Sequence, residues 1–313
     1  MQVVTDLGQL TRAEPTILTI GTFDGVHRGH QWLIRQVADR ARARGHKSLV
    51  ITFDPSPAVT LRPGGTQLTE GTEKIRLISS VGPDVTAMLH FDHEMANVTA
   101  GQFLAEILDH VNLEEIWVGG DFAFGHNREG TVEYLIRAGQ RTGFSVMVVP
   151  RRAILDVPVS STMVRELMRK GDVARAAELL GHYPSIRGTV VTGARRGRQM
   201  GYPTANVAYP ESQVLPATGI YAGYLRTDGG RLPAAISVGF NLVFAGREIK
   251  AEAYILDFDE DVLDTVVSLD FVERLRDEQN FESVDALVQQ MGRDVEQTRE
   301  ILARAEEPGE LLL

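Results

Sequence analysis

Two histidines and three glycines fall within ten residues, in the stretch GTFDGVHRGH at 21–30. The apolar run TILTI precedes this stretch, and a segment with helical periodicity follows it. His27 and His30 stand three residues apart, so their rings would share one face on the first turn of a helix. The amino end of such a helix offers unpaired N–H groups and a positive dipole end, both suited to an anion. We therefore expect the two imidazoles to hydrogen-bond a phosphate and to oppose charge that develops at phosphorus.

Two other interpretations of the histidine pair stay open. A His-x-x-His pair can bind a metal ion, although no further His, Asp or Glu stands at a convincing ligand spacing. Two such histidines can also be unrelated surface residues. Gly21 and Gly25 let the backbone turn and approach a bulky group closely. Together with the preceding strand and the following helix, these glycines favour the phosphate site.

The first half of the chain has the pattern of a sheet that could position this stretch. Apolar runs alternate with amphipathic segments, as in a parallel sheet covered on both faces. Gly45 is expected to end the first long helix, and Thr99 to cap a later one. The alternation predicts an α/β fold with a doubly wound parallel sheet that binds ligands at the carboxyl ends of its strands. The expected strands are 16–20, 48–53, 84–91, 114–120 and 144–150.

The periodicity changes from about residue 186. Short β-like runs separated by Gly, Pro and Asp follow one another without helices between them, which predicts an antiparallel barrel or sandwich. A helical stripe then covers roughly 283–307. Because Pro184 interrupts the pattern, we expect two domains, at 1–183 and 186–313.

The composition excludes several classes of protein. The chain has 313 residues, a formal net charge of −10 and no cysteine. Disulfides, thiolate nucleophiles and thiolate metal sites are therefore excluded, and an acidic chain is not expected to bind nucleic acid. Its apolar runs fall far short of the roughly 20 residues that a membrane span needs, and its N-terminus lacks the pattern of a signal peptide. We expect a soluble, cytoplasmic protein whose partners are small molecules, and whether it forms a homo-oligomer stays open.

The stretch GTFDGVHRGHQ, followed by TFDPSP at 52–57, resembles the bacterial bifunctional riboflavin kinase/FMN adenylyltransferases, also called FAD synthetases. The resemblance covers nearly the whole chain and implies a Rossmann-like nucleotidyltransferase domain followed by a riboflavin kinase barrel with terminal helices. It also implies that ATP and Mg²⁺ serve the conversion of riboflavin to FMN, and that ATP then adenylylates FMN to FAD. Four further segments match in the family's order, namely VGGDFAFG, VSSTMVRELMRKGDVARAAELLG, GARRGRQMGYPTAN and FVERLRDEQNF.

The resemblance implies roles for residues of the first domain. His27 and His30 would bind the ATP phosphates, and Asp121 would lie near the adenosine or the metal. The Ser-Ser-Thr segment would begin a helix whose hydroxyl and N–H groups bind an anion, with Arg165 on the leaving pyrophosphate. Such a segment is also typical of an ordinary capped surface helix. The expected ATP-binding residues are Gly21, Phe23, Asp24, Gly29, Asp121, Ser160, Ser161, Thr162 and Arg165, and Asp54 is expected to bind flavin.

The second domain contains four arginines in twelve residues, Arg187, Arg195, Arg196 and Arg198. This cluster is either a solvated basic loop or, because glycines are interspersed, a cradle for polyphosphate. Thr204 and Asn206 alternate and should point to one side of a strand, where their oxygens would suit Mg²⁺. With these two residues, Gly193, Arg198 and Gly201 are expected to bind ATP.

The resemblance implies that Glu252 is the base that accepts the proton of the ribityl hydroxyl. The other interpretation of Glu252 is a solvent-facing strand position. Arg274 and Arg276 would close over the flavin, or else belong to a salt-bridged helix start.

Departures from the family pattern leave alternatives for the second domain. In the first domain Ser56 replaces a frequent histidine, which could alter a flavin contact or a loop position but not the phosphate site. In the second domain Asn241-Leu242-Val243-Phe244 stands where the family commonly shows Asn-Pro-Thr-Phe. The chain could therefore be a monofunctional FMN adenylyltransferase with a non-catalytic, flavin-binding barrel. A third alternative is a nucleotide- or flavin-responsive or RNA-associated binding protein, which the negative net charge opposes.

Overall fold

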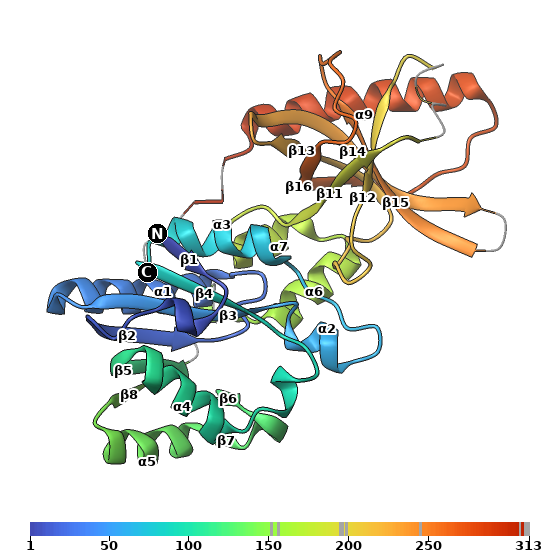
Figure 1. Cartoon of the computed structure of the whole chain (residues 1–313). Helices are drawn as coiled ribbons and strands as arrows, with labels where there is room; N and C mark the ends of the chain where they lie inside the picture. The colour runs from blue at the N-terminus through green and yellow to red at the C-terminus, as the bar shows by residue number, and fades with distance from the viewer. Residues whose placement is uncertain are drawn as a thin grey trace. The chain divides into compact units, whose positions relative to one another are not determined.

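The structure is a computed structural model that describes residues 1–150, 153–154, 157–193, 197, 200–243, 246–306 and 308–309, with side chains described outside 153–158 and 241–248. The chain forms two compact units, one from Met1 to Ser160 and the other from Ser161 onward. Figure 1 shows a sheet with helices in the first unit and a barrel with a long helix in the second.

A six-stranded parallel sheet forms the centre of the first unit, in the order β1-β4-β3-β2-β5-β8. The predicted parallel sheet is confirmed, and each predicted run lies on a strand. The edge strand β1 was not predicted, because three residues are too few to show a period. The strands are β1 (Gln2–Val4), β2 (Pro15–Ile20), β3 (Lys47–Asp54), β4 (Val85–His90), β5 (Asn112–Gly119) and β8 (Ser145–Val149).

Two helices of the first unit have the ends that the sequence predicted. Gly45 ends α1 in the left-handed conformation at φ 66°, and Thr99 caps α4 in a capping box with Gln102. Both devices satisfy backbone groups that the helix leaves unpaired. The helices are α1 (Arg28–Arg44), α2 (Pro57–Leu61), α3 (Gly71–Val81), α4 (Ala100–His110) and α5 (Val132–Thr142), with 3₁₀ turns at Leu7–Gln9, Met95–Asn97 and His126–Arg128 and a small hairpin of β6 (Ala123–Phe124) and β7 (Gly130–Thr131).

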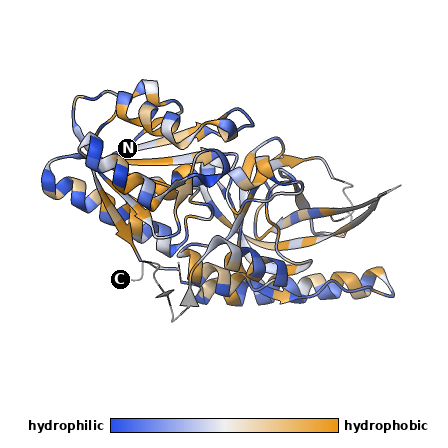
Figure 2. Ribbon diagram, turned by 90° about the horizontal axis from the view of Figure 1, so that it is seen from below, coloured by the Kyte–Doolittle hydropathy of each residue, from blue (hydrophilic) through white to orange (hydrophobic). Residues whose placement is uncertain are grey.

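Helices pack on both faces of this sheet, which explains why its strands are apolar almost continuously. On β2, Leu18 belongs to one buried cluster with Ile107 of α4 and Leu135 of α5. Its neighbour Ile17 packs instead with Val37 of α1. Figure 2 shows apolar residues along the strands and residues of both kinds on the helices.

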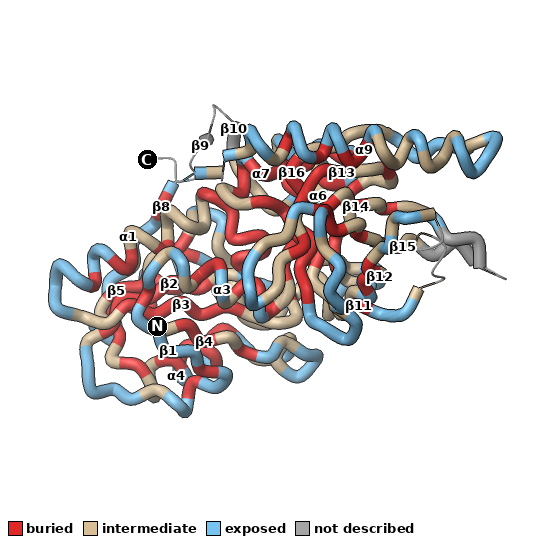
Figure 3. Tube along the Cα trace, turned by 90° about the horizontal axis from the view of Figure 1, so that it is seen from above, coloured by how far each residue is buried: buried red, intermediate tan, exposed pale blue. Residues whose placement is uncertain are grey.

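The second unit contains a closed barrel in the order β11-β12-β15-β14-β13-β16, with antiparallel neighbours throughout. The predicted antiparallel barrel and terminal helix are both confirmed. Figure 3 shows the barrel strands largely buried and α9 exposed along much of its length. The strands are β11 (Ser185–Val191), β12 (Thr204–Ala208), β13 (Gly219–Thr227), β14 (Gly230–Val243), β15 (Gly246–Ile255) and β16 (Val266–Arg276), and α9 is Val284–Arg304.

Two helices that precede the barrel, α6 (Ser161–Lys170) and α7 (Val173–Leu180), belong to the second compact unit. Ala177 of α7 shares a buried cluster with Tyr183, Val272 and Ile301. The sequence boundary near 183 would assign these helices to the first domain, and that boundary stays a prediction. The remaining described strands, β9 (Ala153–Ile154) and β10 (Val157–Pro158), form a two-stranded sheet.

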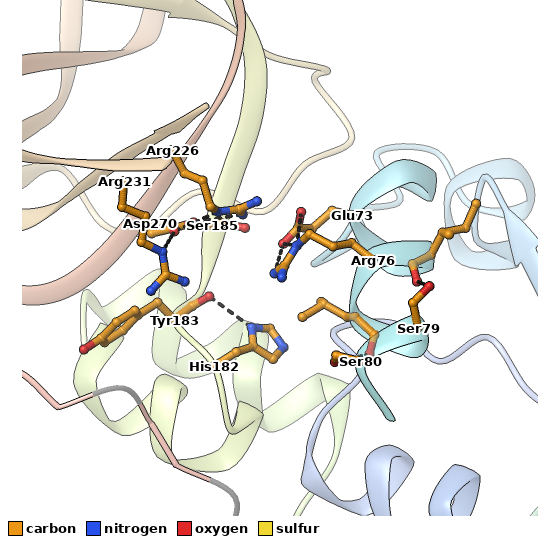
Figure 4. A network of polar contacts seen from close by, with 12 residues as sticks. Glu73, Arg76, Ser79, Ser80, His182, Tyr183, Ser185, Arg226, Arg231 and Asp270 are labelled. Carbon is orange, nitrogen blue, oxygen red and sulfur yellow. Dashed lines mark hydrogen bonds and ion pairs between the residues drawn. The ribbon is translucent and has the colours of Figure 1, made fainter. Parts of the chain in front are cut away.

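A buried carboxylate lies on barrel strand β16. Asp270 is 1% exposed and pairs with Arg226 at 3.0 Å and with Arg231 at 3.2 Å. Arg231 also lies over the rings of Tyr183 and Tyr224, and Figure 4 shows both guanidiniums beside Asp270. Two cations therefore compensate the burial of this charge.

Within the part of the chain that the structure describes, no helix has the length and apolar character to cross a membrane.

Candidate active site

The turn between β2 and α1 adopts an unusual backbone that burial holds in place. Phe23, Gly25 and Val26 have positive φ angles of 43°, 79° and 36°, a region that costs a β-branched residue free energy. Phe23 and Val26 are 2% and 0% exposed and pack with Ile34 of α1 and Val50 of β3. Packing against α1 and β3 therefore fixes the conformation of the turn that positions the two histidines.

The histidine pair forms as its spacing predicted. His27 caps α1, and its Nδ1 accepts a hydrogen bond from the backbone N–H of His30 at 3.3 Å. The two rings stack with centroids 3.5 Å apart and an interplanar angle of 17°. Because Nδ1 of His27 is an acceptor, the neutral ring carries its proton on Nε2. His27 can thus present an N–H donor to a ligand at the amino end of α1.

Burial keeps His30 neutral. It lowers the pKa of His30 well below the usual value, and the charges of His27 and Lys74 lower this pKa further. The Nδ1 atom of His30 is buried without a hydrogen-bond partner in the protein. Two imidazolium ions at stacking distance would also repel each other strongly. Near neutral pH the His30 ring therefore acts as a hydrogen-bonding group more than as a proton donor.

Two glycines of the motif make room for aromatic rings. A Cβ at Gly29 would lie 3.3 Å from the ring of His27, and one at Gly21 would lie 2.9 Å from the ring of Phe23. Phe23 in turn contacts His30 edge-on, with centroids 5.2 Å apart. These glycines thus serve the placement of the rings as well as any close approach of a ligand.

Asp24 links the turn to the loop before α3. It is 2% exposed, and its Oδ1 accepts hydrogen bonds from the backbone N–H groups of Leu68 at 2.8 Å and Thr69 at 3.2 Å. Thr69 Oγ1 accepts a further bond from the Gly25 N–H at 3.1 Å. Asp24 therefore holds two loops together at the carboxyl ends of β2 and β3, and its expected contact with ATP stays a prediction.

The other residues expected at ATP in the first domain lie on separate elements. Asp121 is exposed in the turn after β5. Ser160 is the last residue of the first unit, while Ser161, Thr162 and Arg165 lie on the first turns of α6 in the second unit. The predicted helix start at the Ser-Ser-Thr segment is confirmed, and its anion-binding role stays a prediction.

A second group of functional side chains lies on the barrel. Asn206 of β12 stands directly opposite Glu252 of β15 in the strand register, and Thr204 Oγ1 donates a hydrogen bond to Glu252 Oε2 at 3.0 Å. The predicted common side of Thr204 and Asn206 is confirmed, because these partly buried residues alternate with interior ones. The interior neighbours on the two strands are Ala205, Val207, Ala251 and Ala253.

Glycines of the arginine-containing loop come close to this group. A Cβ at Gly193 would lie 2.2 Å from Nδ2 of Asn206, so only glycine fits there without displacing the amide. Gly201 has a φ of 83° in the turn before β12. The side chains expected to line the cradle, Arg195, Arg196 and Arg198, lie outside the described residues, while Arg187 is on β11.

Arg274 and Arg276 lie at the end of β16, not at a helix start. Arg274 donates to the carbonyl of Thr218 at 2.6 Å and pairs with Asp277 at 2.6 Å. Arg276 pairs with Asp294 of α9 at 2.7 Å. The ion pairing that the sequence suggested is present, and Asp294 is a partner that no local pattern indicated.

Oxygen donors dominate the barrel group, which fits Mg²⁺ brought in with ATP. Thr204, Asn206 and Glu252 supply a hydroxyl, an amide and a carboxylate on one outer face, the ligand types that Mg²⁺ prefers. Phosphate oxygens and water would complete its coordination. Among the described residues no group of three or more His, Asp or Glu could hold a metal ion by itself.

Comparisons with known proteins match both halves of the chain. The family model for FAD synthetase matches residues 9–163, and that for riboflavin kinase matches 180–302. A bifunctional riboflavin kinase/FMN adenylyltransferase from Escherichia coli K12 is 35% identical, covering 96% of this chain and 97% of its own length. One from Listeria monocytogenes is 30% identical over 93% and 94%. A crystal structure from Streptococcus pneumoniae, described as a macrolide-efflux protein, matches with a TM-score of 0.83 and 32% identity, covering 95% and 98% of the two chains.

Proposed function

Because the chain belongs to the bifunctional riboflavin kinase/FMN adenylyltransferase family, we propose that its two groups of functional residues divide the synthesis of FAD between them. The protein phosphorylates riboflavin to FMN and adenylylates FMN to FAD, with ATP as the co-substrate of both steps. The riboflavin kinase match over the barrel favours this function over an adenylyltransferase with a non-catalytic barrel.

The stacked histidine pair carries the assignment of the adenylyltransferase site. In this step an oxygen of the FMN phosphate bonds to the α-phosphorus of ATP, and the bond to the pyrophosphate oxygen breaks. Nε2–H of His27 would donate to the phosphate oxygens on which charge develops, beside the amino end of α1. A stacked, pre-oriented pair needs little reorganisation during the reaction, which suits a transfer that depends on positioning.

The leaving pyrophosphate requires a separate anion site. Ser160, Ser161 and Thr162 supply hydroxyl and N–H groups at the start of α6, and Arg165 one turn later supplies a fork of donors. Helix α6 has ten residues, which is long enough for its amino end to attract an anion. These residues would therefore bind the β- and γ-phosphates.

The barrel group would catalyse the kinase step. The ribityl 5′-hydroxyl bonds to the γ-phosphorus as ADP leaves, and its proton passes to the carboxylate of Glu252. The hydrogen bond from Thr204 engages Oε2 of Glu252, which leaves Oε1 for the substrate. Mg²⁺ held near Thr204 and Asn206 would neutralise phosphate charge. We also propose that the flavin is bound by Asp54 in the first site and by Arg274 and Arg276 in the second.

A time course with purified protein, riboflavin, ATP and Mg²⁺ tests the division of labour. Wild-type protein should form FMN first and FAD later. Glu252→Gln should abolish FMN formation but leave the conversion of supplied FMN to FAD near normal, and His27→Asn with His30→Asn should do the opposite. Equal loss of both steps in either variant would refute the assignment. Cytoplasmic location and the use of Mg²⁺ belong to the same proposal.

A further inference from the structure

A fully buried lysine lies on α3, which packs against the turn that carries the histidine pair, and it has no role in the reaction described above. Lys74, on α3, is 0% exposed. Burying an ammonium group is costly unless hydrogen bonds and opposite charges compensate it. Burial accordingly lowers the pKa of Lys74, while attraction to Asp24 and Asp54 opposes this change.

The hydrogen bonding of Lys74 is incomplete. Its Nζ donates a hydrogen bond to the backbone carbonyl of Phe53 at 2.6 Å. An ammonium group has three N–H donors, and among the described residues this carbonyl is the one acceptor that engages them. Glu73, the acidic residue next to it, pairs with Arg76 at 2.6 Å, as Figure 4 shows. Oδ1 of Asp54 is likewise buried without a hydrogen-bond partner. A polar group therefore lies here that the fold alone does not satisfy.

The position of this group coincides with the proposed adenylyltransferase site. Phe53 and Asp54 end β3, and Asp24 follows β2, at the carboxyl edge of the sheet. His30 lies on the first turn of α1, and the charge of Lys74 acts on it. The charged and titratable groups that bear on His30 from the neighbouring elements are His27 and Lys74, with Asp24 and Asp54 placed around the lysine.

We propose that Lys74 is a positioning residue of the adenylyltransferase site, whose ammonium is fixed on the Phe53 carbonyl, orders Asp24 and Asp54, and places a positive charge next to the histidine pair. This inference rests on the proposed function of that pair. The charge attracts the triphosphate without taking part in proton transfer. It also disfavours a proton on His30, so the ring meets the phosphates in its neutral form.

Removal of the charge gives a test with a definite sign. Lys74→Met should lower the rate of FMN conversion to FAD by about 100-fold, the lower end of the range seen when one preorganised electrostatic donor is removed from an active site. Riboflavin phosphorylation, measured on the same molecules, should not change. Because buried Asp24 loses a compensating positive charge, the melting temperature of the first unit should fall, and the rates are therefore compared at a temperature at which both variants are folded. Lys74→Gln, which can keep the bond to Phe53 without the charge, should behave like Lys74→Met.

The pH dependence separates an electrostatic role from a merely structural one. Without the lysine charge the pKa of His30 should rise, so the acidic limb of the rate profile for FAD formation should move to higher pH. Lys74→Arg should keep the wild-type limb. Lys47→Met is the matched control, because Lys47 lies on β3 with 44% of its side chain exposed, and it should change neither rate nor profile.

Wild-type FAD formation in both Lys74→Met and Lys74→Gln would overturn the inference, as would reduced rates with an unmoved acidic limb. A loss of FAD formation that parallels a loss of folded first unit in both variants would also overturn it, by showing a structural role. If the wild-type protein itself made no FAD from FMN, the proposed function would fail instead, so the two failures are distinguishable.

Discussion

Replacing Glu115 by Gln should destabilise the first unit by an amount that depends on pH. Glu115 of β5 has a side chain that is 5% exposed, and it pairs with Arg40 at 2.8 Å and Arg44 at 2.5 Å on α1. It also accepts a hydrogen bond from Trp117 Nε1 at 2.9 Å. Burial opposes the charge of Glu115, but the bonds from Arg40, Trp117 and Arg44 outweigh it and lower the pKa from 4.5 to about 2.

This pKa difference sets the size and the sign of the effect. A carboxylate with a lowered pKa in the folded state stabilises that state above the unfolded pKa, and the contribution is lost as pH falls through the folded pKa. The difference between 4.5 and about 2 corresponds to about 3 kcal/mol at pH 7 and roughly half of that at pH 3. Since both arginines are partly exposed, the measured value should lie at or below this figure.

Tryptophan fluorescence offers a selective assay of the first unit. Both tryptophans of the chain, Trp32 and Trp117, lie in that unit, so urea unfolding followed by fluorescence reports on it alone. Glu115→Gln should lower the free energy of unfolding by about 2–3 kcal/mol at pH 7, and the gap to wild type should narrow between pH 5 and pH 3. The exposed Glu14→Gln should change it by less than about 0.5 kcal/mol. A gap that stays constant down to pH 3 would refute the electrostatic reasoning.

Two further predictions concern the barrel. Gly193→Ala should displace Asn206, because the new Cβ would lie 2.2 Å from its Nδ2. The Michaelis constant for ATP in the kinase step should then rise about tenfold, while FAD formation from FMN stays normal. An unchanged Michaelis constant would contradict this prediction. Asp294→Asn should weaken the ion pair between residue 294 and Arg276. The side chain of Asp294 is 6% exposed and that of Arg276 is 15% exposed. The expected loss is about 3 kcal/mol of stability in the second unit, with a higher Michaelis constant for riboflavin, and wild-type melting of that unit would exclude it.

Features that depend on neighbouring residues in the sequence were predictable. The strands of the first unit are buried on both faces, so their apolar runs are continuous, and Thr99 and Gly45 mark helix ends by their own chemistry. The stacked histidines likewise follow from a three-residue spacing on one helical turn. The family resemblance supplied the activities of the two domains, whereas periodicity alone predicted only a parallel sheet followed by an antiparallel barrel or sandwich.

Features that depend on distant parts of the chain were not predictable. Lys74 stands in an amphipathic helix, where nothing local distinguishes it from a surface lysine, and only the tertiary fold buries it near His30. The pairing of Arg276 with Asp294 joins a strand end to a helix that follows a separate turn. In each case the tertiary packing of helices and strands decides which residues become neighbours. No fixed spacing in a single sequence reveals such a pairing.

Both sites orient their principal side chain through a hydrogen bond from a neighbouring group. The His30 N–H engages Nδ1 of His27, which directs the remaining proton to Nε2. The Thr204 hydroxyl engages one oxygen of Glu252, which leaves the other for the proton transfer that we propose. In phosphoryl-type transfer, where positioning and charge neutralisation supply most of the catalysis, such bonds fix a lone pair or a proton before the substrate arrives. The loss of an orienting partner should therefore reduce the rate even where the principal side chain remains.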